Sequence, residues 1–158
     1  MSEPRGRHIP PPELRALLVS SPEFANLVLP GTYADAANWS ALQRGYRVHG
    51  LSGESLVSDR AGEWHPDWWV FATNYFADPF FVDLRDADAG FPVRFASAGA
   101  GRWTPILVAD SVSEFSGWLE HIAALESEPH TAGRYVEMEL PDNEFWEEVA
   151  ATYREDDE

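Results

Sequence analysis

Four short apolar runs occupy the middle of the chain, and they constrain the fold more than any other feature. The runs cover residues 68–73, 80–84, 91–96 and 105–109. Each has the length of a strand, and the links between them are short and turn-like. Because a parallel pair needs a crossover of about a dozen residues or more, such links predict antiparallel neighbours. The continuous apolar character of the runs indicates that both faces of the sheet are covered, at least in part.

Helical patterns precede this block. A proline in the first turn and leucines at helical spacing predict a short helix over 12–18. Ser21 and Pro22 are typical of the start of a second helix, which would continue over 22–28. Thr32, followed three residues later by an acid, predicts a third helix that ends near Gly45.

The clearest helix follows the last apolar run. Ser111 and Glu114 form a capping box, in which each side chain bonds a backbone N–H of the first turn. Apolar side chains then share one face: Val112, Phe115, Trp118, Leu119, Ile122 and Leu125. Beyond it, imperfect alternation over 135–140 predicts an edge strand, and Pro141 starts a last helix with four inward residues. These are Phe145, Trp146, Val149 and Tyr153.

These elements predict an α+β fold with a mostly antiparallel central sheet and helices packed on it. A chain of 158 residues with 44% hydrophobic residues fits one domain, 1–158. We expect residues 1–11 to be a flexible lead-in and residues 154–158 to be a frayed acidic tail.

The net charge of −16 excludes several partners. It repels nucleic-acid phosphates and anionic lipid, so we expect neither as a partner. The charge is uneven, because residues 137–158 carry ten acids against Arg154. No apolar run approaches the about 18 residues of a membrane span, and residues 1–12 lack the apolar stretch of a secretory signal. The predicted location is therefore the cytoplasm.

Catalytic and cofactor signatures are incomplete. The segment 50–54 lacks the closing glycine of a nucleophile elbow, and the glycine-rich segment 98–102 lacks the lysine of a phosphate loop. The five histidines are scattered and cysteine is absent, so we predict no cofactor and no metal. Asp86 and Asp88 fit a turn better than a calcium loop. One catalytic alternative stays open: a hydrolase that uses Asp78 and Asp83 as paired carboxylates.

Aromatic residues are concentrated between positions 64 and 81. They are Trp64, Trp68, Trp69, Phe71, Tyr75, Phe76, Phe80 and Phe81. Since side chains of a strand alternate between its faces, neighbouring aromatics cannot all point into one core. Aromatic side chains dominate binding hot spots, and surrounding acids steer a partner. We therefore predict a partner-binding face made by Trp64, Asp67, Trp68, Tyr75, Asp78 and Asp83.

The order of several short motifs resembles the SUKH superfamily, which has the Smi/Knr-like fold. The motifs are the segment 65–73, the loop and strand 77–84 that ends Asp83-Leu84, the Pro-Val strand 91–95, and the segment 109–119 that holds Ser111-Val112-Ser113-Glu114-Phe115. The resemblance covers about residues 22–125. The chain departs from the family's pattern at Ala77, where the family has Gly, and at Arg44, where Asn is common. No motif can be placed after about residue 130.

This resemblance implies a compact α+β domain that works by binding proteins. Many bacterial members resemble immunity proteins that block a cognate toxin directly, and fungal members are regulatory. The family has no catalytic residue set. We therefore expect a binding module that neutralises a basic toxin, because an acidic inhibitor is steered to a basic cleft. A stand-alone regulatory scaffold is the alternative.

Overall fold

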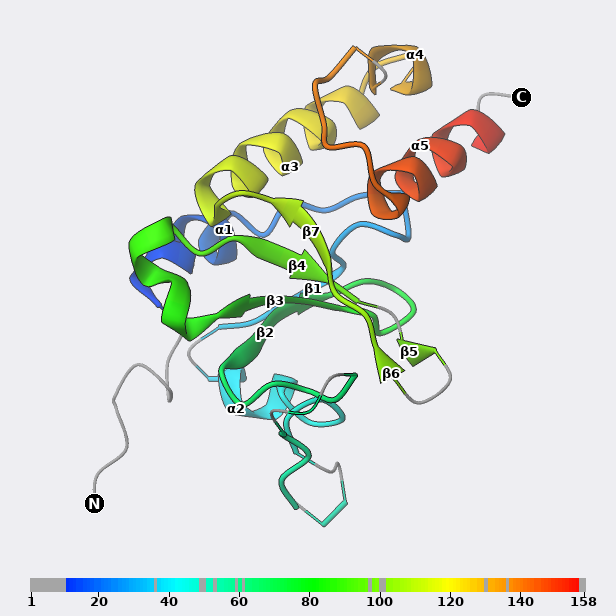
Figure 1. The fold of residues 1–158 in the computed structure, drawn as a ribbon. Helices are drawn as coiled ribbons and strands as arrows, with labels where there is room; N and C mark the ends of the chain where they lie inside the picture. Colours follow the sequence, from blue (N-terminus) through cyan, green and yellow to red (C-terminus); the bar gives the residue numbers. More distant parts are fainter. Residues whose placement is uncertain are drawn as a thin grey trace.

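A computed structural model gives the fold of the chain (Figure 1). It describes residues 11–35, 37–48, 51–52, 54–58, 60, 62–96, 98–99, 102–129, 131–135 and 137–156. Apart from Pro11, the predicted lead-in over 1–11 lies outside these ranges, as do the last two residues of the predicted tail. Along the described ranges, no helix has both the length and the apolar character needed to cross a membrane.

A five-stranded antiparallel sheet forms the centre of the molecule. Its strand order is β1-β2-β3-β4-β7, and every neighbouring pair is antiparallel. The strands are β1 Thr32–Tyr33, β2 Trp68–Thr73, β3 Pro79–Asp83, β4 Val93–Phe95 and β7 Ile106–Ala109. A separate hairpin of β5 Ala98–Gly99 and β6 Arg102–Trp103 lies between β4 and β7 in the chain. The predicted α+β fold with an antiparallel central sheet is confirmed.

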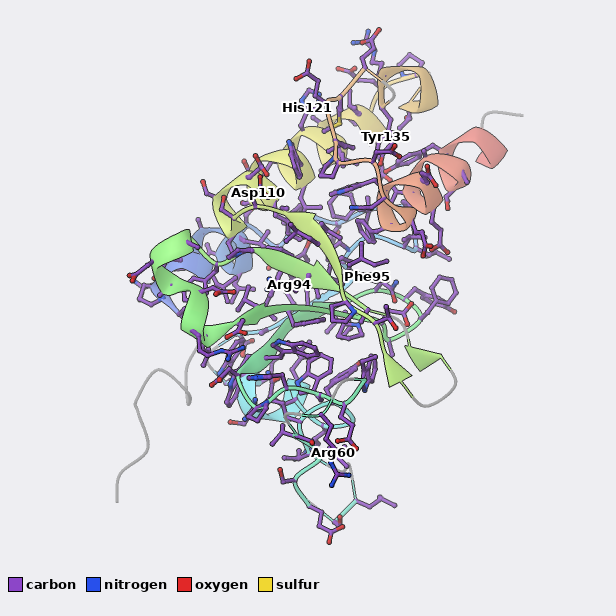
Figure 2. The ribbon with its side chains drawn as sticks, viewed as in Figure 1. Arg60, Arg94, Phe95, Asp110, His121 and Tyr135 are labelled. Carbon is purple, nitrogen blue, oxygen red and sulfur yellow. The ribbon has the colours of Figure 1, made fainter. Side chains whose placement is uncertain are left out.

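Helices cover mainly one face of this sheet. They are η2 Pro12–Leu14, α1 Arg15–Ser20, α2 Trp39–Leu42, η3 Leu84–Ala89, α3 Val112–Glu126, α4 Thr131–Tyr135 and α5 Glu144–Asp156. Figure 1 shows α3 and α5 above the sheet, while α2 and the long connection up to β2 lie below it. We call these the helix side and the loop side. Side chains fill the space on both sides (Figure 2).

Strand alternation divides the aromatic residues between the two sides. Phe80 is fully buried on the helix side, where its ring contacts those of Phe95, Phe115 and Phe145 at centroid distances of 5.1–5.7 Å. The next residue, Phe81, is also fully buried but belongs to the loop-side cluster. The runs that form β2 and β3 therefore have both faces largely buried, as their sequence predicts, whereas Leu107 of β7 is exposed.

The predicted cap of α3 is present with one change. The Glu114 N–H donates to the Ser111 hydroxyl (3.1 Å), as a capping box requires. The Glu114 carboxylate accepts from the Asp110 N–H (3.1 Å), one residue before the cap, and so reaches further than the motif predicts. Ser111 therefore caps the helix as predicted, whereas Glu114 fixes the chain just before the cap instead of the cap residue itself.

The helix predicted over 22–28 is wrong. Ser21 ends α1 in the left-handed conformation (φ 42°), and the chain then runs irregularly between α3 and α5. The Glu126 carboxylate of α3 accepts the N–H groups of Ala25 (2.6 Å) and Asn26 (3.1 Å). The Asn26 amide in turn donates to the carbonyl of Val149 in α5 (3.1 Å). Tertiary partners thus replace the bonds of a helix, which overrides the local pattern.

Three other boundaries differ from the sequence prediction. Thr32 and Tyr33 form β1 against β2, so the helix predicted from Thr32 is reduced to α2. Gly45 has the positive φ of 89° expected of a helix stop. The edge strand predicted over 135–140 is wrong, because Tyr135 belongs to α4 and the described residues 137–140 form no strand. The Tyr135 hydroxyl donates to the Trp146 carbonyl (3.0 Å). Helix α5 extends to Asp156, into the predicted tail.

The first half of β2 is bonded on its open edge by side chains. The Gln43 amide donates to the Val70 carbonyl (2.8 Å) and accepts from the Val70 N–H (2.9 Å), as a neighbouring strand would. The indole N–H of Trp64 donates to the Trp68 carbonyl (2.9 Å). Buried backbone groups need such partners, and here the loop side supplies them.

The other edge of the sheet, β7, is bonded from α5. The Asn143 amide donates to the Leu107 carbonyl (2.9 Å), and the Trp146 indole N–H donates to the Val108 carbonyl (2.9 Å). The start of α5 is thereby fixed to the sheet. Side-chain donors thus occupy backbone carbonyls of the first and last long strands.

Candidate functional site

The turn between β2 and β3 is organised by one buried amide. The Asn74 side-chain oxygen accepts the N–H groups of Phe76 (2.9 Å) and Asp78 (3.0 Å). The Asn74 nitrogen donates to the Val28 carbonyl (3.4 Å) and to the Asp78 carboxylate (3.3 Å). Ala77, where the family pattern has Gly, adopts φ 66°, a conformation that Gly accepts with less strain. The hydrogen bonds of Asn74 therefore fix the conformation of the turn.

This turn presents large apolar side chains to solvent. Tyr75 is 72% exposed, Phe76 is 59% exposed, and their rings meet edge to face at a centroid distance of 5.5 Å. Leu27 is 46% exposed and accepts the Tyr75 N–H at its carbonyl (3.2 Å). We call Leu27, Tyr75 and Phe76 the turn patch. Adjacent exposed apolar side chains of this size are typical of interaction surfaces.

A groove lies beside the turn patch. Its volume is about 230 Å³, and Tyr75 and Leu27 line one part of it. Phe24 and Pro30 supply further apolar wall, and the amide of Asn26 supplies a polar contribution. A groove of this kind, next to exposed aromatic rings, has the size to accept one side chain of a partner.

A carboxylate at the end of the turn is partly withdrawn from water. Burial raises the pKa of Asp78 above its ordinary value, and the hydrogen bond from Asn74 lowers it in part. Burial also raises the pKa of Tyr46, and the nearby charge of Asp78 raises it further. The Tyr46 hydroxyl donates to the Ala77 carbonyl, which attaches the turn to the loop side. A negative charge thus lies close to the turn patch.

The other predicted acids lie at the opposite end of β3. Asp83 is buried and accepts from the Arg85 guanidinium at 2.6–3.2 Å. Burial alone would raise the pKa of Asp83, but the hydrogen bonds and positive charge of Arg85 outweigh it and hold this pKa below its ordinary value. Asp67 pairs with the same guanidinium (3.3 Å), and its N–H donates to the His65 ring (3.1 Å). This cluster stabilises the end of the strand.

The two acids of the hydrolase alternative do not meet. Asp78 directly precedes β3 and Asp83 ends it, so five residues at about 3.3 Å each separate them by about 16 Å. Paired carboxylates of glycoside hydrolases stand about 5–9.5 Å apart. Within the described ranges, no three His, Asp or Glu side chains lie close enough together to hold a metal ion. The geometry therefore supports neither a paired-carboxylate site nor a metal centre there.

The two predicted tryptophans pack on the loop side. Trp64 is buried, and its ring contacts Phe81 (centroid distance 4.6 Å) and Trp68 edge to face (5.4 Å). Trp68 is half-buried and also lies against Phe81 (4.9 Å). Of the six predicted residues, the structure brings Tyr75 and Asp78 together in one exposed turn. Asp67 and Asp83 form the separate ion-pair cluster.

Sequence reasoning missed Leu27, Phe76 and Asn74. Phe76 stands next to Tyr75 and was within reach, because a turn between two strands exposes its central residues. Asn74 carries a signal as well, since Asn directly after an apolar run is typical of a turn that bonds its own backbone. No local sequence pattern indicated that Leu27 is exposed beside the turn, and its segment was predicted as a helix.

Comparison of the chain with protein-family models, with curated proteins and with solved structures finds no match. The SUKH resemblance therefore stays a prediction that rests on the order of the motifs. The geometry of the turn patch and the charge of the chain are the observations on which a function can be argued.

Proposed function

We propose that this chain is a protein-binding module that docks a basic partner through the turn patch. The observation that carries the proposal is the exposed pair Tyr75 and Phe76, presented by a turn that Asn74 holds in one conformation. Exposing two aromatic rings is unfavourable for an isolated domain, and a partner that covers them gains that free energy. Because the turn is preorganised, little entropy is lost on binding.

Charge supports a basic partner. The chain carries −16, and the exposed acids Glu144, Glu147 and Glu148 lie along α5 on the helix side. Such a field accelerates the encounter with a positively charged protein and slows encounters with acidic ones. In this proposal the aromatic pair supplies affinity, whereas the acids supply rate and partner choice.

The partner class that we favour is a cognate bacterial toxin, which the SUKH resemblance implies. In that role the chain works in the cytoplasm as an immunity protein and blocks the toxin without chemistry of its own. A stand-alone regulatory scaffold would use the same surface. Gene order separates the two, because an adjacent toxin gene supports immunity and an isolated gene supports regulation.

Binding by the turn patch is tested with a double variant. Tagged wild-type chain and Tyr75→Ser/Phe76→Ser are used to capture partners from the native cell, and the partner found is then titrated against both. We expect the double variant to lose at least a hundredfold in affinity, since each aromatic anchor contributes more than about 1.4 kcal/mol. The matched control is Val19→Ser on α1, which removes an apolar side chain that is 79% exposed elsewhere.

Two results would contradict this proposal. One is a partner that binds wild type and the double variant equally well. The other is an association rate that does not fall between low and high salt, because steering by charge is screened by ions. Toxin neutralisation is tested separately, by co-expressing the partner with wild type or the double variant and scoring growth.

A further inference from the structure

A second hollow lies on the loop side and shares no lining residue with the turn patch. It has a volume of about 190 Å³ and is lined by three aromatic residues, Tyr46, Trp64 and Trp103. The exposed side chain of Glu63 lines it as well. We call this hollow the loop-side pocket. No basic side chain of the described residues lines it.

The three rings meet at an angle to one another. Their centroid distances are 5.7 Å for Tyr46 and Trp64, 5.8 Å for Tyr46 and Trp103, and 5.2 Å for Trp64 and Trp103. The planes of these pairs are inclined by 45°, 56° and 78°. The three rings therefore pack against one another, and Trp64 is almost fully buried beneath the other two. Tyr46 and Trp103 are half-buried, so they are the rings that present surface to the hollow, and we call the three rings the aromatic bowl.

Bonds from separate parts of the chain hold these rings in place. The backbone N–H of Trp103 donates to the Gly62 carbonyl (2.8 Å), which fixes the β5–β6 hairpin against the loop. The Trp64 indole N–H is bonded to the β2 backbone, and the Tyr46 hydroxyl to the turn after β2. At the rim, Gly45 and Gly62 have φ of 89° and 86° and carry no side chain that could close the pocket.

We propose that the loop-side pocket binds an alkylated ammonium group. Aromatic faces attract cations through the ring quadrupole, and a carboxylate at the rim adds a direct charge. Alkylated ammonium groups are weakly hydrated, so they lose little hydration when they enter a pocket with aromatic walls. The chain accommodates a cation in this way at another place, where the Arg47 guanidinium lies 4.0 Å from the centre of the Trp69 ring. The overall charge of −16 favours the same ligand class.

The same chemistry has two sources, a free organic cation such as choline and a trimethylated lysine side chain on a polypeptide. The pocket recognises the head group that both share. Its floor and walls come from residues other than the turn patch, so this inference does not depend on the proposed function. Figure 2 shows Arg60 on the loop below the sheet, well away from α3 and α5, and Arg60 does not line the pocket.

The test compares choline with its neutral isostere, 3,3-dimethylbutan-1-ol, in calorimetric titrations of the full chain. We expect choline to bind at least about tenfold more tightly, since only the cation gains from the ring quadrupoles and from Glu63. Equal binding of the two molecules would show a simple apolar hollow and overturn the inference. Absence of choline binding would overturn it as well.

Variants locate the site and identify the source of the ligand. Trp103→Leu should weaken choline binding about tenfold and Glu63→Gln about threefold, whereas Val19→Ser on α1 should leave it unchanged. Because Glu63 is exposed, Glu63→Gln keeps the fold even if Trp103→Leu does not. A short peptide with trimethyllysine that binds more tightly than choline supports a polypeptide source, and equal affinities support a free cation. Unchanged affinity in both pocket variants contradicts the site.

Discussion

Both sides of the sheet bury aromatic side chains, but different kinds of structure cover them. Phe80 and Phe81 are neighbours on β3, both are fully buried, and they point to opposite sides. Phe80 is covered by side chains of α3 and α5, whose backbones bond within each helix. Phe81 is covered by Trp64, which lies near the end of an irregular connection, and by Trp68, the first residue of β2.

This difference teaches how an irregular cover is made stable. A helix satisfies its own backbone, so it needs only an apolar face to cover a sheet. A loop has no such internal pairing, and each buried backbone group needs a specific partner. On the loop side, Gln43 and the Trp64 indole act as those partners. The helix side therefore depends on area, whereas the loop side depends on a few hydrogen bonds.

The largest expected effect on stability comes from removing one buried aromatic side chain on each side of the sheet. Phe80→Ala should lower the free energy of unfolding by about 4 kcal/mol, because α3 and α5 are held by several contacts and cannot collapse into the cavity. Phe81→Ala should cost about 3 kcal/mol, since the loop cover can partly relax. Denaturant unfolding of both variants measures the difference.

Hydrogen exchange shows which side of the sheet each of these two variants destabilises. In Phe81→Ala the amides of Leu56 and Ser58, which bond within the loop side, should exchange faster while those of α3 do not. In Phe80→Ala the order should reverse. If both variants affected all amides alike, the two sides would form one cooperative unit and the comparison would fail.

Removing a hydrogen-bond partner on the loop side should have the next largest effect on stability. Gln43→Leu keeps the side-chain volume but leaves the N–H and carbonyl of Val70 without their partner, at a cost of about 2–3 kcal/mol in the free energy of unfolding. Thermal and denaturant unfolding check this value. A loss under about 0.5 kcal/mol would mean that water replaces the amide, and that the loop side does not depend on these bonds.

A smaller effect is expected where β3 ends, and it depends on pH. Asp83 caps η3 and binds Arg85, so Asp83→Ala should cost about 1–2 kcal/mol at neutral pH. The pKa of Asp83 lies below its ordinary value of 3.8, so its charge stabilises the fold above that pH. The contribution disappears as the pH falls below 3.8 through the lowered folded-state pKa.

Asp83→Asn separates the cap from the charge. Asn retains the capping oxygen, so this variant should lose the acid-dependent part of the stability and keep most of the rest. Unfolding measured from pH 6 to pH 2 gives the two curves. Parallel curves for wild type and Asp83→Asn would show that Asp83 makes no such contribution.

The smallest expected effect is at the cap of α3 on the helix side. Ser111→Ala should lower the free energy of unfolding by about 0.5–1 kcal/mol, because the Glu114 N–H loses its acceptor. Ser111→Asp, which supplies another capping oxygen, should restore it. A cost as large as that of Gln43→Leu would contradict the idea that the helix side depends little on single hydrogen bonds.

The sequence predicted the regular helices and strands well and the irregular segments poorly, for the same physical reason. Helix α3 and the antiparallel strands leave periodic patterns and a cap, so their positions could be read directly. The connection before β2 leaves no period, because its stability comes from pairs such as Gln43 with Val70 that lie far apart in the chain. The segment near Asn26 was mistaken for a helix because the carboxylate that binds it belongs to α3.

The candidate site could be predicted only in part. Tyr75 and Asp78 were named from composition, since aromatics beside acids are typical of binding surfaces. Which of the aromatics face solvent could not be deduced, because Trp64 and Phe81 cover each other on the loop side. The aromatic bowl at Trp103 was also beyond prediction, since its three rings come from separate segments.

The side chains that bond β2 and β7 affect how readily this chain pairs with a second copy at high protein concentration. Gln43 and Trp64 occupy backbone groups of β2, and Asn143 and Trp146 occupy carbonyls of β7. A strand from a second molecule would have to displace these donors before it could extend the sheet. Addition of a strand at β7 or beside the first half of β2 is therefore obstructed in the folded state.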